Sequence, residues 1–274
     1  MKTNYHTHTV WCDGRDTPEA MILSAIEKGF DVLGFSSHST YPDDNACTVP
    51  RLKMPGYFTE VRKLAKKYAV QIKVLGGIEA DYIPGATDPD RSRYAEFKPD
   101  YIIGSVHYVI APDGERVPVD HTPELLHEGL SRHFAGDVKA YLQTYFAQER
   151  EMVERFDFDI LGHPDLCRKF NEKHPYFDET ADWYLHELEL LADAVAKSGK
   201  LVELNTGAIS RGWLNDAYPS ATFRDMLRKR NVRFVLNSDS HAADTLDCAF
   251  DRFADAEDFV AEFSLTKISR PPMI

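Results

Sequence analysis

Cysteine is scarce in this chain, and its few copies are far apart. The 274 residues contain four cysteines, and no two of them have the spacing of a CxxC pair: Cys12, Cys47, Cys167 and Cys248. The pattern predicts neither a disulfide framework nor a cysteine-based zinc site. We therefore expect a reduced, cytoplasmic protein.

Long apolar runs and an excess of positive charge are also missing. No stretch approaches the roughly 20 apolar residues that span a bilayer, and the N-terminal segment MKTNYHTHTV lacks the apolar core of a signal peptide. The chain has 32 basic and 44 acidic residues, which gives a formal net charge of −12. Because nucleic-acid surfaces need clustered Lys and Arg, neither a nucleic acid nor a membrane is an expected partner. A small anionic substrate remains compatible with this charge, since bound metal ions can reverse the local field.

The chain does contain a regular alternation of strand-like and helix-like segments. Strands are expected at 2–9, 31–38, 71–81, 99–109, 156–165, 200–207 and 232–241. Helices are expected at 16–29, 55–70, 180–199, 220–231 and from Asp244 to about Phe263. One more helix carries its apolar face on Val138, Tyr141, Leu142, Tyr145 and Phe146. Thr17 and Pro18 predict the start of the first helix, and Gly29 predicts its end.

Alternating strands and helices predict an α/β fold with a parallel sheet covered by helices. We count seven strand–helix units, and no linker divides them, so we expect one domain over residues 1–274 that forms a closed or nearly closed barrel. A doubly wound open sheet is the alternative, but its usual glycine-rich first turn is missing. Residues 110–135 are expected to be an irregular insertion that forms a lid or a wall of the substrate site.

Histidines and carboxylates gather at the carboxyl ends of the predicted strands. In a parallel barrel these ends meet on one face, where active sites lie. Side chains at positions i and i+2 of a strand share a side, so His6 and His8 can converge on one ion, as can Asp239 and His241. A single histidine at a strand end is usually structural, but its recurrence at successive strands favours a metal site. The predicted ligands are His6, His8, Asp13, His38, Glu79, His107, His163, Asp239 and His241.

Nine such ligands are enough for two or three divalent ions, and Glu79 can bridge two of them. Imidazole and carboxylate ligands suit zinc, iron and manganese alike. Two ions about 3.5–4 Å apart can share a hydroxide and clamp phosphoryl oxygens for in-line attack on phosphorus. No Asp-x-Asp-x-Thr or Cys-x5-Arg motif predicts a phosphoenzyme. The remaining histidines are expected at the surface or in the lid: His121, His127, His133, His174 and His186.

The same ligand pattern resembles the PHP (polymerase and histidinol phosphatase) family of metal-dependent phosphoesterases, over nearly the whole chain. The segments GSVH at 104–107, VPVD at 117–120, LGHPDLCRKF at 161–170 and LVELNTGAISRG at 201–212 are most similar to its monofunctional histidinol-phosphate phosphatases. The resemblance implies a distorted seven-stranded TIM-like (β/α) barrel with a trinuclear centre.

By motif position, the resemblance implies three sets of ligands. They are His6, His8, Glu79 and Asp239 for one ion; Glu79, His107 and His163 for a second; and Asp13, His38 and His241 for a third. Some relatives have a histidine where Asp13 stands here. Glu79, Asp239 and His241 are the residues we expect to be catalytic.

Three residues are predicted to bind substrate. Arg168 and Arg211 match positions that bind the substrate phosphate in the histidinol-phosphatase group, and Arg15 and Arg51 are weaker candidates. Asp120, in the insertion, is expected to bind a cationic amino group.

The leading hypothesis is hydrolysis of L-histidinol phosphate to L-histidinol and phosphate, a step of histidine biosynthesis, by attack of a metal-bridging hydroxide. One alternative keeps the metal centre but changes the ester to a nucleotide, a sugar phosphate or phosphotyrosine. A second alternative is a non-catalytic metal-binding PHP module.

Overall fold

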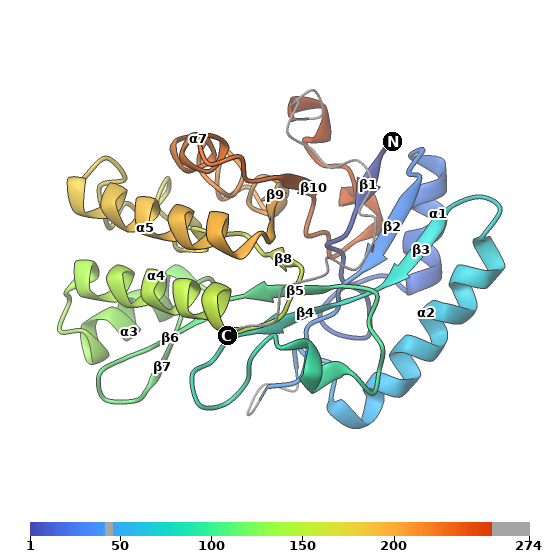
Figure 1. Cartoon of the computed structure of the whole chain (residues 1–274), viewed down its shortest axis with the longest axis horizontal. Coiled ribbons are helices and arrows are strands. Elements are labelled where there is room, and N and C mark those ends of the chain that lie inside the picture. The colour runs from blue at the N-terminus through green and yellow to red at the C-terminus, as the bar shows by residue number, and fades with distance from the viewer. Residues whose placement is uncertain (42–45, 254–274) are drawn as a thin grey trace.

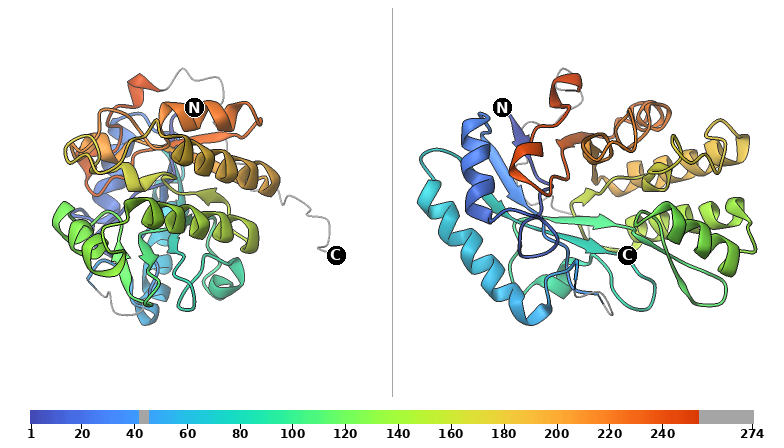
Figure 2. Two further views of the ribbon diagram at one scale, coloured as in Figure 1. Left: turned by 90° about the vertical axis from the view of Figure 1, so that its left-hand side faces the viewer. Right: turned by 180° about the vertical axis from the view of Figure 1, so that it is seen from behind.

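The computed structural model describes residues 1–41 and 46–253 (Figure 1). The strands of its main sheets are β1 (Thr3–Asn4), β2 (Val32–Phe35), β3 (Lys73–Gly76), β4 (Ile78–Asp81), β5 (Ile102–Ser105), β8 (Ile160–Leu161), β9 (Leu201–Asn205) and β10 (Phe234–Asn237). The helices are α1 (Pro18–Glu27), α2 (Met54–Tyr68), α3 (Pro123–His133), α4 (Val138–Arg155), α5 (Asp182–Ser198), α6 (Gly207–Ser210) and α7 (Ala221–Arg228). α1 and α2 lie towards one end of the molecule and α3, α4 and α5 towards the other, as the views in Figure 2 also show.

Two parallel sheets close into one distorted barrel. One sheet has the order β1-β2-β3 and the other the order β10-β9-β8-β5-β4. Parallel bridges between Thr7 and Ser240 and between His38 and Glu79 join the two sheets. The α/β fold and the seven-stranded barrel predicted from the sequence are thus confirmed, with β3 and β4 as two halves of the predicted strand 71–81.

The barrel interior is filled by side chains below the strand ends. A cluster of buried residues takes its members from strands all around the barrel: Tyr5, Val32, Leu75, Tyr101, Ile103, Ile160, Leu201 and Val235. The Tyr101 hydroxyl donates to the backbone carbonyls of Tyr5 and Phe35. A Cβ on Gly34 or Gly77 would lie 2.4 or 2.5 Å from atoms of the Tyr101 side chain, so only glycine fits at these two positions. This layer forms a packed floor, and the polar strand ends lie beyond it.

The helix signals at the first unit are confirmed in detail. The Thr17 side chain accepts a hydrogen bond from the Ala20 amide, and Pro18 is the first residue of α1. Gly29 follows the helix with a left-handed φ of 74°. Away from α1, α4 packs against α5, and α5 packs against α7.

Several predicted elements are wrong in extent or type. The first strand is shorter than 2–9, and the 3-10 helix η2 (Arg91–Tyr94) lies between the third and fourth predicted strands, where no helix was predicted. The helix predicted from Asp244 is replaced, up to residue 253, by the 3-10 helices η4 (Ala243–Thr245) and η5 (Phe250–Arg252). Ala249 has a φ of 58°, which interrupts helical geometry, and residues 254–263 of that prediction lie outside the described residues.

The 110–135 insertion is regular, contrary to the prediction. It contains the antiparallel pair β6 (Tyr108–Ile110) and β7 (Arg116–Pro118), followed by α3. Asp113-Gly114 makes the turn, with a φ of 88° at the glycine, and the Thr122 side chain caps α3 with Pro123 as its first residue. These are the same short-range signals that located α1. In the part of the chain that the structure describes, no helix has both the length and the apolarity to cross a membrane.

Candidate metal centre

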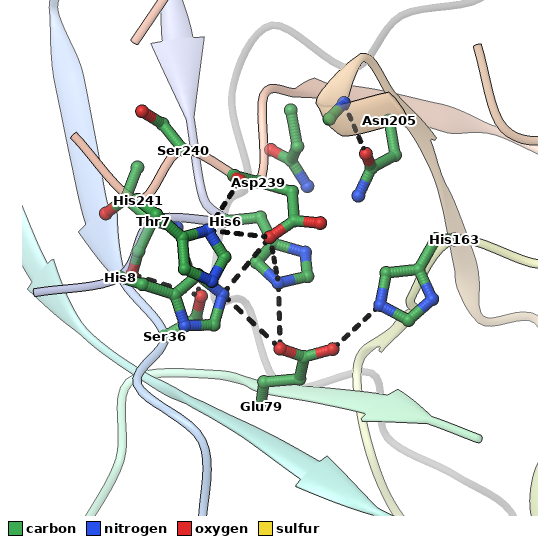
Figure 3. A network of polar contacts seen from close by, with 12 residues as sticks. His6, Thr7, His8, Ser36, Glu79, His163, Asn205, Asp239, Ser240 and His241 are labelled. Carbon is green, nitrogen blue, oxygen red and sulfur yellow. Dashed lines mark hydrogen bonds and ion pairs between the residues drawn. The ribbon is translucent and has the colours of Figure 1, made fainter. Parts of the chain in front are cut away.

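The carboxyl ends of the barrel strands surround a pocket of about 270 Å³. Its lining includes most of the predicted ligands, namely Asp13, His38, Glu79, His107, His163, Asp239 and His241. His6 and His8 lie beneath them, fully buried. Figure 3 shows the imidazoles of His6, His8 and His163 and the carboxylates of Glu79 and Asp239 pointing toward one another.

Glu79, at the start of β4, is at the centre of this arrangement. Its Oε2 lies 3.0–3.4 Å from one imidazole nitrogen of each of three histidines: His6, His8 and His38. Its Oε1 lies 2.9 Å from His163 Nε2 and 3.5 Å from His107 Nε2. Each carboxylate oxygen therefore faces a different set of imidazoles, which is the geometry that a bridging carboxylate requires.

A second group of contacts surrounds Asp239, which follows β10. Its Oδ1 lies 3.5 Å from His6 Nε2, 3.3 Å from His8 Nε2 and 3.7 Å from His241 Nδ1. Asp13 Oδ2 in turn lies 3.3 Å from His241 Nε2. Asp239 has a φ of 49°, a left-handed conformation that is unusual for a non-glycine residue and that recurs at functional sites.

The donor atoms form four overlapping groups that could each hold a metal ion. In each group, all donor atoms lie within 4.8 Å of one another: His8, Asp13, His38 and His241; His6, Glu79 and His163; His6, His8 and Asp239; and His38, Glu79 and His107. Within residues 1–41 and 46–253, the buried His8 Nε2 and His38 Nδ1 have no hydrogen-bond partner, although carboxylate oxygens are close by. Orphaned imidazole nitrogens that face carboxylates in this way fit a multi-metal site of mixed nitrogen and oxygen ligands.

Two further carboxylates, which were not predicted from the sequence, orient the predicted ligands. Glu203 on β9 lies 2.8 Å from His6 Nδ1 through its Oε2, and its Oε1 accepts a hydrogen bond from the His163 amide. Asp81 on β4 lies 2.7 Å from His107 Nδ1. Both carboxylates are fully buried. A carboxylate that contacts Nδ1 fixes the imidazole ring and leaves Nε2 free for an ion. In the sequence, the signal for these two carboxylates was a charged residue in an otherwise apolar strand.

Burial and neighbouring charges shift the pKa values of the site in opposite directions. Burial alone would lower the pKa of His6, but the carboxylates of Glu203, Glu79 and Asp239 outweigh it and raise that pKa well above the usual value. For His8, burial together with the neighbouring His241 and His38 lowers the pKa to about 3. His8 is therefore neutral at pH 7, the form in which an imidazole binds metal.

The pKa values of the Glu79 and Asp239 carboxylates stay low despite their burial. Burial opposes ionisation of Glu79, but the imidazoles of His6, His38 and His107 hold its pKa well below the usual value. For Asp239, burial is likewise outweighed, first by Arg211 and then by His6. Both groups are anionic at neutral pH, as metal binding requires.

Arg211 directly follows α6, lines the pocket and contacts Asp239. Its Nη1 lies 3.2 Å from Asp239 Oδ2, and its Nη2 donates to the Asp239 carbonyl at 3.1 Å. A Cβ on Gly207 would lie 2.4 Å from Arg211 Nη1 and 2.9 Å from Asp239 Oδ2, so glycine is needed here for the close approach of the guanidinium. The structure thus brings Arg211 to the predicted ligands.

Arg168 is placed differently. Its side chain is buried, its Nε donates to Glu179 at 2.6 Å, and its Nη1 lies 3.8 Å from Asp165. It is not among the residues that line the pocket. The neighbouring Lys169 does line the pocket, together with Asp120. A direct phosphate contact by Arg168 stays a prediction, whereas the structure brings Arg211, Lys169 and Asp120 to the pocket.

The weaker candidates and the remaining histidines lie mostly away from this pocket. Arg15 pairs with Asp244, and Arg51 pairs with Glu96, at exposed positions. Of the histidines expected at the surface or in the lid, His121 lines the pocket, His127 and His174 line a separate cavity beside α3, His133 lies 2.8 Å from Asp113, and His186 is exposed on α5.

Residues 4–207 match the model of the PHP domain, and the chain therefore belongs to the PHP domain family. Among its relatives, a probable histidinol-phosphatase of Deinococcus radiodurans is 30% identical over 257 residues, which cover 92% of this chain and 89% of that protein. The histidinol-phosphatase of Bacillus subtilis is 22% identical over 269 residues, 92% of this chain and 98% of the other.

Solved structures share the fold. A candidate histidinol phosphatase of Listeria monocytogenes superimposes with a TM-score of 0.81 at 22% identity, covering 92% of this chain and all of that one. The histidinol phosphate phosphatase of Lactococcus lactis, solved with zinc, L-histidinol and phosphate, gives a TM-score of 0.62 at 21% identity over 88% of this chain and 87% of the other.

Proposed function

We propose that this chain is a metal-dependent phosphomonoesterase that hydrolyses L-histidinol phosphate to L-histidinol and phosphate. The observation that carries the proposal is Glu79, whose two carboxylate oxygens each face different imidazoles in a pocket that also holds the Arg211 guanidinium. Bound divalent ions would supply an activated water and electrostatic stabilisation of the phosphoryl group. The substrate class is supported by relatives named histidinol-phosphatases, which match most of the chain.

Different residues would bind the metal ions, the phosphate and the organic part of the substrate. The nine predicted ligands, centred on Glu79, Asp239 and His241, would hold two or three ions of zinc, iron or manganese. Arg211 would bind the phosphoryl oxygens, since its planar fork suits a phosphate and its Nη atoms already lie over Asp239. Asp120, which lines the same pocket, would face the organic part of the substrate.

His8→Ala tests the metal-dependent reaction. His8 is fully buried and belongs to two of the four groups that could hold an ion. We expect the variant to retain less metal and to lose phosphate release from L-histidinol phosphate by at least about 100-fold. The control is His186→Ala, an exposed histidine on α5, which should leave metal content and turnover unchanged.

The substrate is tested by phosphate release from a panel of monoesters and diesters with metal content measured in parallel. A preference for L-histidinol phosphate by orders of magnitude is the expected result. Better turnover of a nucleotide, a sugar phosphate or phosphotyrosine would replace the substrate and keep the metal centre. Bound metal without hydrolysis of any ester would contradict the enzyme assignment and favour a non-catalytic PHP module.

A further inference from the structure

Lys169 forms an ion pair with Asp120, the carboxylate of the insertion that lines the pocket. Lys169 Nζ lies 2.9 Å from Asp120 Oδ2 and donates to the Asp120 backbone carbonyl at 2.7 Å. Both residues line the pocket, and 12% of the Lys169 side chain and 19% of the Asp120 side chain are exposed. The pair joins the segment after β7 to the turn after β8, two parts of the chain that are 49 residues apart.

Asp120 thus presents a small cradle for a cation. Two oxygens, one from the carboxylate and one from the backbone, converge on a single ammonium nitrogen. An ammonium group has three N–H donors, and Lys169 uses two of them to bind Asp120. Because the Lys169 charge is compensated by the Asp120 carboxylate at contact distance, the pair adds little net positive charge that would attract a phosphate.

The cradle is in reach of the proposed reaction site. Asp120 and Lys169 line the same pocket of about 270 Å³ as Arg211, His107 and His163. A monoester whose phosphate lies at the metal ligands and Arg211 would therefore have its alcohol portion in the same pocket as Asp120. The flexible four-carbon stem of lysine allows its ammonium group to leave the cradle.

We propose that Lys169 determines specificity by occupying the Asp120 cation subsite in the free enzyme, from which the ammonium group of an amine-bearing phosphate monoester displaces it. This inference rests on the proposed function. Lys169 acts as an internal competitor: it weakens the binding of amine-bearing esters, and it keeps a partly buried carboxylate paired when no substrate is bound. Esters without an amino group do not compete for the subsite.

Lys169→Met tests this directly, because it keeps most of the stem and removes the competing charge. The readout is the ratio of kcat/KM for L-histidinol phosphate to kcat/KM for 4-nitrophenyl phosphate, which lacks an amine. We expect the ratio to rise about fivefold in Lys169→Met and to fall about tenfold in Asp120→Asn. The matched control is Lys173→Met, an exposed lysine on the same turn, which should leave the ratio as in the wild type.

An unchanged ratio in Lys169→Met overturns the proposal, and a lowered ratio does so as well, because it would make Lys169 a direct substrate ligand. If Lys169→Met does not fold, Asp120→Asn decides, since a wild-type ratio there contradicts a cation subsite. Binding of L-histidinol, measured by calorimetry, separates this inference from the proposed function. Even if neither ester is hydrolysed, L-histidinol should bind about fivefold more tightly to Lys169→Met than to wild type, and equal affinities refute the competition.

Discussion

Replacing Glu203 by glutamine tests whether a residue outside the predicted ligand set controls the metal centre. Glu203 is fully buried on β9, and its two oxygens serve four donors. Oε2 lies 2.8 Å from His6 Nδ1 and accepts from Asn237 at 2.9 Å, while Oε1 accepts from the His163 amide and from Asn205 at 2.7 Å. Glutamine offers one oxygen and one NH2 group, so two of the four donors would face another donor.

The expected magnitude follows from these contacts. Loss of a carboxylate that orients a metal-binding histidine typically costs about 10–100-fold in metal affinity, which corresponds to about 1.4–2.8 kcal/mol. Each buried donor left without an acceptor would cost about a further 1–3 kcal/mol in the free energy of unfolding. Glu203→Gln should therefore lose metal to a competing chelator at concentrations that leave the wild type loaded.

The assay is metal content per chain after equilibration with a chelator series, alongside chemical denaturation. Glu187→Gln is the matched control, because Glu187 is also buried and pairs with Arg150 at 2.6 Å, but it lies on α5 away from the pocket. It should lose stability and keep wild-type metal affinity. A folded Glu203→Gln variant with wild-type affinity would refute the role assigned to Glu203.

Three further predictions concern pH, a glycine and an arginine. Although burial opposes it, the carboxylates around His107 raise its pKa to about 10, above the unfolded value of 6.5. Its protonation therefore stabilises the metal-free protein fully below pH 6.5 and less as pH rises towards 10. The denaturation midpoint of chelator-treated protein should fall across this window, while the apparent metal affinity rises. A midpoint that rises instead would contradict this effect of the carboxylates on His107. Gly207→Ala should displace the Arg211 guanidinium and the Asp239 carboxylate, which a Cβ would approach to 2.4 and 2.9 Å, and lower kcat/KM about tenfold or more. Normal kinetics would contradict the need for glycine at this position. Arg168→Ala removes the arginine partner of the buried Asp165 and of the partly exposed Glu179 and should lower the free energy of unfolding by about 3 kcal/mol. Its effect on KM should be smaller than that of Arg211→Ala, and the reverse order would support the predicted phosphate contact of Arg168.

The strand-end residues could be predicted because each one lies where a local pattern ends. His8, His38 and His163 follow apolar strand segments, and parallel strands bring such positions to one face whatever their separation in the sequence. Glu203 could not be distinguished in the same way, since it lies within β9, and Asp81 ends β4 only two residues after Glu79. Their role depends on a contact with one histidine, and for Glu203 that histidine is 197 residues away.

The insertion illustrates a different limit. Its turn at Asp113-Gly114 and its helix start at Thr122 carry ordinary local signals and could have been predicted. The pairing of Asp120 with Lys169 could not, because it depends on how the hairpin lies against the turn after β8. The same holds for Arg168, which the motif places near the pocket but which Glu179 and Asp165 hold in a buried ion-pair cluster.

The break between β3 and β4 shows how the pattern of a strand can be right while its continuity is wrong. Leu75 and Glu79 are four residues apart, and the alternation of a single strand predicts that both face the barrel interior. They do so, since Leu75 lies in the interior cluster and Glu79 at the metal centre. At the break, a Cβ on Gly77 would lie 2.5 Å from the Tyr101 ring, so only glycine fits between the two strands. β3 then pairs with β2, while β4 pairs with β5. Glu79 is therefore bridged to His38 on one side and paired in register with Ile103 on the other, so that its two carboxylate oxygens reach imidazoles from both halves of the barrel.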